Sequence, residues 1–151
     1  MAPGAILSMR IAVVDGQGGG IGKHIVEKLR REFPEDTEIL ALGTNALATS
    51  VMLRAGANEG ATGENAIVFN APRVNLITGP VSILIPNAML GELTAPMAAA
   101  LAASPARKVL LPLTRSGIEI IGLRSEPLPH LIGELVQRLK ELAVRQPGAA
   151  R

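Results

Sequence analysis

The hydrophobic residues of the first third of the chain alternate between short continuous runs and longer stretches with helical spacing. Residues 11–14 form a continuous apolar run, which is typical of a strand buried on both faces of a parallel sheet. Apolar side chains recur at helical spacing over residues 21–33, and Pro34 ends that pattern, so this stretch predicts a helix. Residues 37–42 predict a second strand. Together these segments have the length of a βαβ unit, about 30 residues or slightly more.

The middle of the chain continues the same alternation with weaker signals. A second helix is predicted at 46–55, after a cap at Thr44 or Asn45. The small and polar residues 59–65 favour a brief edge strand and a loop, and a short helix is expected from Glu64 to about residue 71. Residues 74–78 predict a strand that ends at Gly79 and Pro80, whereas 81–85 fits a strand or a helix equally well.

The last third predicts one helix, a hairpin and a final helix. Thr94 is a suitable N-cap for an alanine-rich helix that ends near Ser104. Residues 109–113 and 118–123 predict two strands joined by a turn at 114–117 that contains Arg115. Residues 128–142 keep one apolar stripe and predict an amphipathic C-terminal helix, followed by a disordered tail at 146–151.

These elements predict a three-layer Rossmann-like α/β fold with a mostly parallel sheet, built as a single nucleotide-binding domain over residues 1–145. In such a sheet, ligands bind at the carboxyl ends of the strands. The loops at 15–22, at 43–45 and at Gly79 all fall on that edge, so we expect a binding site there. The alternative is that these glycines serve only the turns between helices and strands.

Composition removes several classes of function. The chain has no cysteine, which excludes disulfides, thiolate metal ligands and thiol catalysis. Its 15 basic residues barely outnumber its 13 acidic ones, and two Phe residues are its only aromatic side chains, so nucleic acid is not an expected partner. The most apolar stretch, 74–90, contains Pro and Asn and is not expected to cross a membrane. We therefore expect a cytoplasmic protein. A mean hydropathy of +0.32 favours a homo-oligomer.

The most distinctive motif is the turn between the first strand and the first helix. Five of the seven residues from Gly16 to Gly22 are glycine. Glycine allows a sharp turn and lets an anion approach the backbone N–H groups at a helix N-terminus. The spacing Gly16, Gly20 and Gly22 resembles the cofactor turn of short-chain dehydrogenases/reductases. That resemblance implies that a pyrophosphate lies over residues 18–22 and that the cofactor is NAD or NADP.

Two features separate the chain from that enzyme family. Where an acidic residue would bind the ribose, the chain has Gly43, Thr44 and Asn45, so neither NAD nor NADP is favoured. The Tyr of the reductase catalytic pair cannot exist, because the chain has no tyrosine. A P-loop is a second interpretation, since Gly22 and Lys23 end the turn, but the spacing is one residue too long and His24 replaces the expected Ser or Thr.

Most of the chain also resembles an uncharacterised bacterial family defined only by a domain of unknown function. The matching segments are 9–29, 41–50, 55–67, Gly79-Pro80 and 87–92. The resemblance implies a Rossmann-like fold and no particular activity.

The predicted binding residues belong to the loops at this one edge of the sheet. They are Asp15, Gly16, Gln17, Gly18, Gly19, Gly20, Ile21, Gly22, Gly43, Thr44, Asn45, Gly79 and Asn87. Glu64, Asn65 and Glu92 could also reach the site, either to contact a ligand or to brace the loops. We therefore expect a nucleotide- or dinucleotide-binding module. The alternatives are an enzyme that uses Asp15, Glu64 or Glu92 as acid or base, and a structural protein without a ligand.

Overall fold

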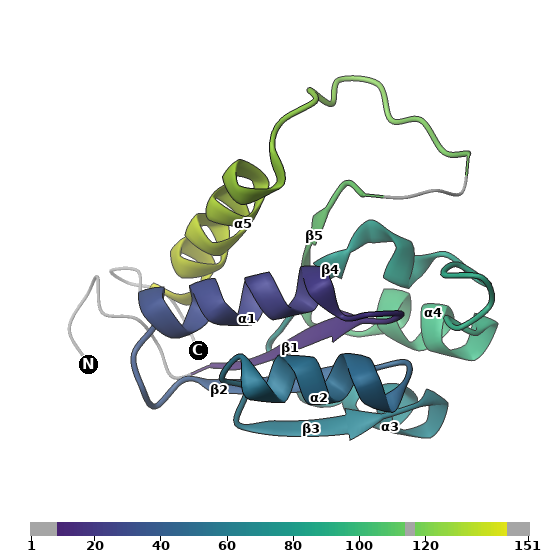
Figure 1. The fold of residues 1–151 in the computed structure, drawn as a ribbon, viewed down its shortest axis with the longest axis horizontal. Coiled ribbons are helices and arrows are strands. Elements are labelled where there is room, and N and C mark those ends of the chain that lie inside the picture. Colours follow the sequence, from purple (N-terminus) through teal and green to yellow (C-terminus); the bar gives the residue numbers. More distant parts are fainter. Residues whose placement is uncertain (1–8, 114–116, 145–151) are drawn as a thin grey trace.

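The computed structural model describes residues 9–113 and 117–144. Within these residues five strands form one sheet in the order β3-β2-β1-β4-β5, and every recorded pairing is parallel. The strands are β1 (Arg10–Asp15), β2 (Glu38–Gly43), β3 (Glu59–Thr62), β4 (Leu76–Pro80) and β5 (Arg107–Leu111). The predicted Rossmann-like α/β fold is therefore confirmed, and β1 lies at the centre of the sheet (Figure 1).

Helices cover both faces of this sheet. They are α1 (Gly20–Glu32), α2 (Ala46–Arg54), α3 (Glu64–Asn70), α4 (Ala95–Ala103) and α5 (Leu128–Ala143), with short 3-10 turns η1 (Ala71–Arg73) and η2 (Val81–Leu84). Alternate residues of each strand point to opposite faces, as in any strand. Thus Ile11 and Val13 pack with α1, α2 and α5, whereas Ala12 and Val14 pack with α3 and α4. The predicted C-terminal amphipathic helix is α5.

One predicted strand is wrong. Residues 118–123 belong to no helix or strand, and the whole segment 117–127, which we call the arm, loops away from the sheet (Figure 1). Alternating apolar residues form a strand only where a neighbouring strand offers hydrogen-bond partners. In the described part of the chain, β5 pairs with β4 alone. The predicted turn with Arg115, the tail at 146–151 and residues 1–8 lie outside the described residues.

Residues 81–85 fitted a strand or a helix equally well in the sequence. In the structure Val81–Leu84 form the 3-10 helix η2 directly after β4, and Ile85 is extended. In the ranges 9–113 and 117–144, no helix is long and apolar enough to span a membrane.

Candidate functional site

The structure brings the predicted site segments to the carboxyl edge of the sheet. Strand β1 ends at Asp15, which is in register with Gly43 at the end of β2. Gly43 is in turn in register with Thr62 at the end of β3. On the other side of β1, strand β4 ends at Gly79 and Pro80. The loops that follow these strands therefore surround the turn between β1 and α1.

Asp15 acts as the internal brace of this turn. Its side chain is only 4% exposed, and its two carboxylate oxygens accept hydrogen bonds from the backbone N–H of Gly16 at 2.8 Å and of Gly22 at 2.7 Å. Burial raises the pKa of the Asp15 carboxyl, the two N–H donors act in the opposite direction, and the charge of Glu92 raises the pKa further. Both oxygens thus hold the start of α1 against the end of β1.

Other backbone N–H groups of the turn remain available. The N–H of Gly19 donates to the carbonyl of Gly16 at 2.9 Å, which closes the turn before α1 begins at Gly20. In the described ranges, the N–H groups of Gly18, Gly20 and Ile21 have no recorded acceptor. Free N–H groups and the helix dipole favour an anion at this end of α1.

Most glycines at this edge are required by the fold. Gly19 has a φ of 73°, and a Cβ there would lie 2.8 Å from Ala48 Cα. At Gly79, φ is 150° and a Cβ would collide with the Val14 carbonyl oxygen. Close packing likewise explains three further glycines, namely Gly16, Gly22 and Gly43.

Gly18 and Gly20 differ from these five. Both are exposed, neither has a positive φ, and a Cβ on either would meet no atom within 4 Å. The fold therefore gives no steric reason for glycine at these two positions. Their N–H groups also lack a recorded acceptor in the part of the chain that the structure describes.

Glu92 forms the second polar centre of the site. One oxygen of its carboxylate, Oε1, accepts hydrogen bonds from the Gln17 N–H at 2.8 Å, the Thr44 hydroxyl at 2.7 Å and the Asn45 side-chain amide at 2.8 Å. The donors from Gln17 and Thr44 lower the pKa of the Glu92 carboxyl, with a smaller effect from Asn45. Asn45 also accepts from the Ala48 N–H at 2.9 Å and so caps α2, as predicted.

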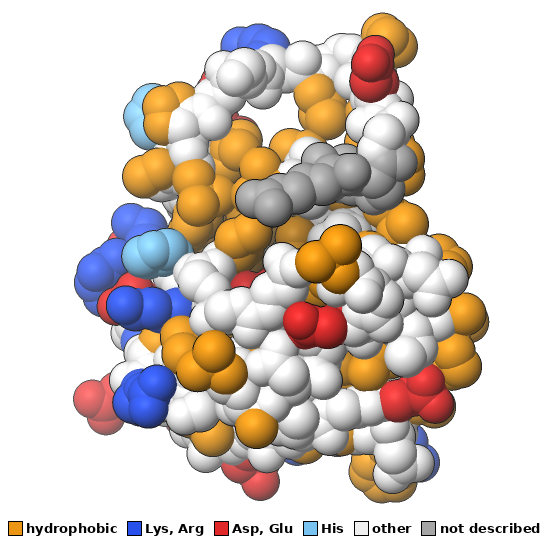
Figure 2. Space-filling view, turned by 45° about the vertical axis from the view of Figure 1, so that its right-hand side comes forward, with side chains coloured by type: hydrophobic (Ala, Val, Ile, Leu, Met, Phe, Trp, Pro, Cys, Tyr) orange, Lys and Arg blue, Asp and Glu red, His pale blue; other side chains and the backbone are white. Residues whose placement is uncertain are grey.

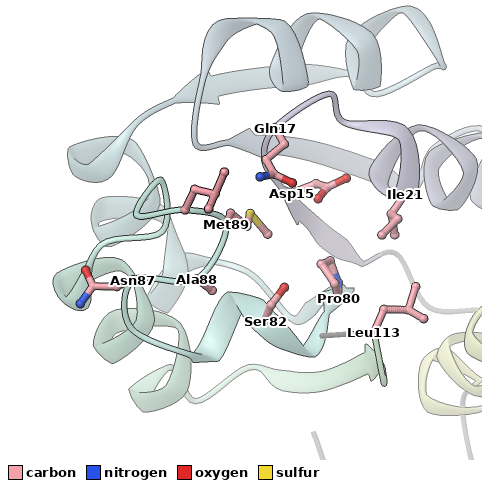
Figure 3. Close-up of a pocket in the computed structure, with 10 residues that line it drawn as sticks. Asp15, Gln17, Ile21, Pro80, Ser82, Asn87, Ala88, Met89 and Leu113 are labelled. Atoms are coloured by element: carbon pink, nitrogen blue, oxygen red, sulfur yellow. The ribbon is translucent and has the colours of Figure 1, made fainter. Parts of the chain in front are cut away.

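A cavity of about 640 Å³ opens beside the turn, between the ends of β1 and β4 (Figure 3). Of the predicted site residues, Asp15, Gln17, Ile21 and Asn87 line it. The other lining residues were not predicted from the sequence; they are Pro80, Ser82, Ala88, Met89, Leu90 and Leu113. Pro80, Ser82 and residues 88–90 lie within three positions of the predicted Gly79 or Asn87, whereas Leu113 is near neither of them in the sequence.

The loop at 87–92 forms one wall of the cavity and has an unusual backbone. Asn87, Met89 and Leu90 have φ values of 65°, 59° and 57°, which few residues other than glycine adopt. Figure 3 shows the Asn87 side chain turned away from the other labelled side chains. Leu90 is 98% exposed, so its side chain contributes almost no buried surface to the fold.

Comparison with known families shows to which family the chain belongs. A family model described as a domain of unknown function, DUF3842, matches residues 10–144. The chain belongs to the DUF3842 family. No curated protein matches it at a significant level.

Among solved structures, the DUF3842 chain is similar to one described as the crystal structure of AibC, with a TM-score of 0.49 and 15% sequence identity. The similarity covers 96% of this chain and 46% of that one. The chain thus spans less than half the length of that structure.

The remaining candidates of the DUF3842 chain lie outside the cavity lining. The Glu64 carboxylate accepts from the Thr94 hydroxyl at 2.5 Å, and Asn65 is exposed next to it on α3. His24 contacts Glu27 at 3.2 Å on an exposed face of α1. Within the two described ranges, no three side chains of His, Asp or Glu come together as metal ligands.

Proposed function

We propose that this DUF3842 protein binds a nucleotide or dinucleotide, with the phosphates over the turn from Gly16 to Gly22 and the N-terminus of α1. The observation that carries the proposal is the pair Gly18 and Gly20. Both face open space in ordinary backbone conformations, so the fold does not account for them. A ligand that must approach the backbone closely does account for them.

The position of Gly20 supports the same view. Gly20 is the first residue of α1, where an alanine side chain would find nothing within 4 Å of the described residues. The fold therefore accepts a side chain there, whereas a phosphate bound at this end of the helix would lose its close approach to the backbone.

The surroundings of the turn also fit a nucleotide. The N–H groups of Gly18, Gly20 and Ile21, which have no recorded acceptor among residues 9–113 and 117–144, suit the phosphate oxygens. The cavity lies between β1 and β4, which is the switch point where open α/β sheets bind ligands, and its volume is in the usual range for small-molecule sites. NAD and NADP are therefore the first ligands to test, as part of a wider nucleotide panel.

The carboxylates favour binding over acid or base catalysis. Asp15 uses both oxygens on backbone N–H groups, Glu92 holds three donors, and Glu64 accepts from Thr94. Each of them has an internal partner, which is the behaviour of residues that shape loops. We therefore propose a binding module and assign it no reaction.

The test compares Gly20→Val with the wild-type chain. Binding of NAD, NADP, ATP, GTP and adenosyl compounds is measured by thermal shift and titration calorimetry. We expect Gly20→Val to bind the ligand of the wild-type chain about tenfold or more weakly, since the new side chain occupies the phosphate position. We expect its free energy of unfolding to change by no more than about 1 kcal/mol.

Gly133→Val is the matched control, because Gly133 lies within α5, outside the cavity lining, and a Cβ there also meets nothing within 4 Å. It should leave the affinity unchanged. The proposal fails if no compound in the panel binds the wild-type chain, or if Gly20→Val binds as tightly as wild type.

A further inference from the structure

The end of β2 lacks a group that the proposed function would need there. Sheets that bind dinucleotides commonly place a carboxylate at this point, where it accepts hydrogen bonds from the ribose hydroxyls. Strand β2 instead ends in Leu42 and Gly43, followed by Thr44 and Asn45. None of these side chains carries a charge.

Glu92 brings a carboxylate to this place from a distant part of the chain. Its Oε1 lies 2.7 Å from Thr44 Oγ1 and 2.8 Å from Asn45 Nδ2, directly after β2. The loop that carries it passes over Gly16, where an added Cβ would lie 2.6 Å from Met89 Sδ and 3.2 Å from Glu92 Oε1. The carboxylate therefore stands between the glycine turn and the end of β2.

The two oxygens of Glu92 have different surroundings. All three hydrogen bonds from Gln17, Thr44 and Asn45 go to Oε1, which fixes the carboxylate in position. Among residues 9–113 and 117–144, no donor to Oε2 is recorded, and Glu92 is partly exposed. One oxygen anchors the group and the other is open to a further donor.

The charges near Glu92 indicate which group of a ligand could donate to its second carboxylate oxygen. Residues 43–49 contain no Lys, Arg or His that could pair with a second phosphate at this point. A phosphate on the ribose 2′ oxygen would face the Glu92 carboxylate, and like charges in contact are strongly unfavourable. A ribose with both hydroxyls free would instead donate hydrogen bonds to it.

We propose that Glu92 accepts the ribose hydroxyls of the bound nucleotide and selects ligands with a free 2′-hydroxyl over ligands with a 2′-phosphate. The inference rests on the proposed function, and it names the ligand class. NAD is then the preferred form over NADP. The same carboxylate completes, from the loop after β4, the ribose site that β2 leaves without an acid.

Ligand pairs test the inference on the unmodified chain. Titration calorimetry compares NAD with NADP, and 5′-ADP with 2′,5′-ADP. The wild-type chain should bind the ligand without the 2′-phosphate at least about tenfold more tightly in each pair. Equal or tighter binding of the 2′-phosphorylated ligand overturns the inference even though nucleotide binding stands. If none of the four ligands binds, the proposed function fails for this class and the inference fails with it.

The variant Glu92→Gln then tests the residue. Its amide oxygen can still accept from the three donors, so the loop is retained while the charge is removed. Glu92→Gln should reduce the preference within each pair to about threefold or less. Glu64→Gln is the control, because Glu64 is exposed and lies outside the cavity lining, and this variant should keep the wild-type preference. An unchanged preference in a Glu92→Gln chain with wild-type circular dichroism overturns the role of Glu92. If that variant does not fold, the comparison of ligand pairs on the wild-type chain still decides the inference.

Discussion

Two carboxylates border the glycine turn, and their surroundings shift their pKa values in opposite directions. Asp15 is nearly enclosed, and burial raises the pKa of its carboxyl despite two backbone donors. Glu92 is partly exposed, and its donors from Gln17, Thr44 and Asn45 lower its pKa below the usual 4.5. The stability of the fold therefore decreases as pH rises through the folded pKa of Asp15, because the buried carboxyl must then ionise. Glu92 has the opposite effect: its ionised carboxylate stabilises the fold, and this contribution is lost as pH falls through its folded pKa.

A pH series of unfolding free energies for wild type and Glu92→Gln should isolate this contribution. Asp15 is present in both chains, so the effect of its burial on its pKa cancels from the difference, and only the smaller effect of the Glu92 charge on the Asp15 pKa remains. Because the folded pKa of Glu92 is lowered, wild type should exceed the variant in stability at neutral pH. That difference should shrink as pH falls below about 4.5, the ordinary pKa of a Glu carboxyl. A difference that stays constant or grows toward acid would contradict the assigned hydrogen bonds.

At the scale of elements, the loop at 87–92 stands out because it holds non-glycine residues in left-handed conformations. Leu90 has a φ of 57° and a 98% exposed side chain. A left-handed conformation costs a leucine about 1 to 2 kcal/mol, and so little buried surface cannot offset that cost. Such strain is often found at functional sites, and this loop carries Glu92 and lines the cavity.

Opposite substitutions at adjacent positions test this strain. Leu90→Gly should raise the free energy of unfolding by about 1 kcal/mol, because glycine adopts a positive φ without a steric penalty. Gly91→Ala should lower it by about 1 kcal/mol, since Gly91 has a φ of 92° and open space around it. Chemical denaturation of both variants gives the two values. A loss of stability in Leu90→Gly would show that the side chain has a packing role.

Elements with strong periodicity could be predicted from the sequence because local signals and tertiary packing agree there. The apolar run before Asp15 and the helix that ends at Pro34 correspond to β1 and α1. The segment 118–123 shows the limit of this reasoning, since its alternation is typical of a strand but no strand of the described residues pairs with it. The contacts of Glu92 could not be predicted from the sequence either. They join residues 47 to 75 positions apart through a loop whose conformation no local pattern predicts.

At the scale of the whole molecule, the arm exposes a run of large apolar side chains. Ile118, Ile120, Ile121 and Leu123 are between 45% and 95% exposed. Figure 2 shows hydrophobic side chains gathered over the upper part of the molecule, where the arm lies. Strand β5, in the described ranges, is paired on one side alone, and an unpaired strand edge can bind a further strand. We expect a second copy of the chain to cover these groups, with the arm of one copy against β5 of the other.

Light scattering coupled to size-exclusion chromatography measures this association. The wild-type mass should rise above the monomer mass of 15.7 kDa toward twice that value as concentration increases. Ile121→Glu should keep the chain near the monomer mass, because it places a charge on the apolar arm. Leu90→Glu is the control, since Leu90 is equally exposed but lies outside the arm. A wild-type chain that remains monomeric at all concentrations would rule out this association.

The hydrogen bond from the Gln17 N–H to Glu92 also bears on the order in which the protein assembles. It closes a chain segment of 75 residues, and such distant contacts form late because they require the intervening chain to be ordered first. During synthesis, β1, the glycine turn, α1 and β2 emerge well before residue 92, so the turn exists for a time without its second carboxylate. The site is completed only when β4 has joined β1 and the following loop has crossed the turn. Ligand binding would therefore report that the centre of the sheet is already in place.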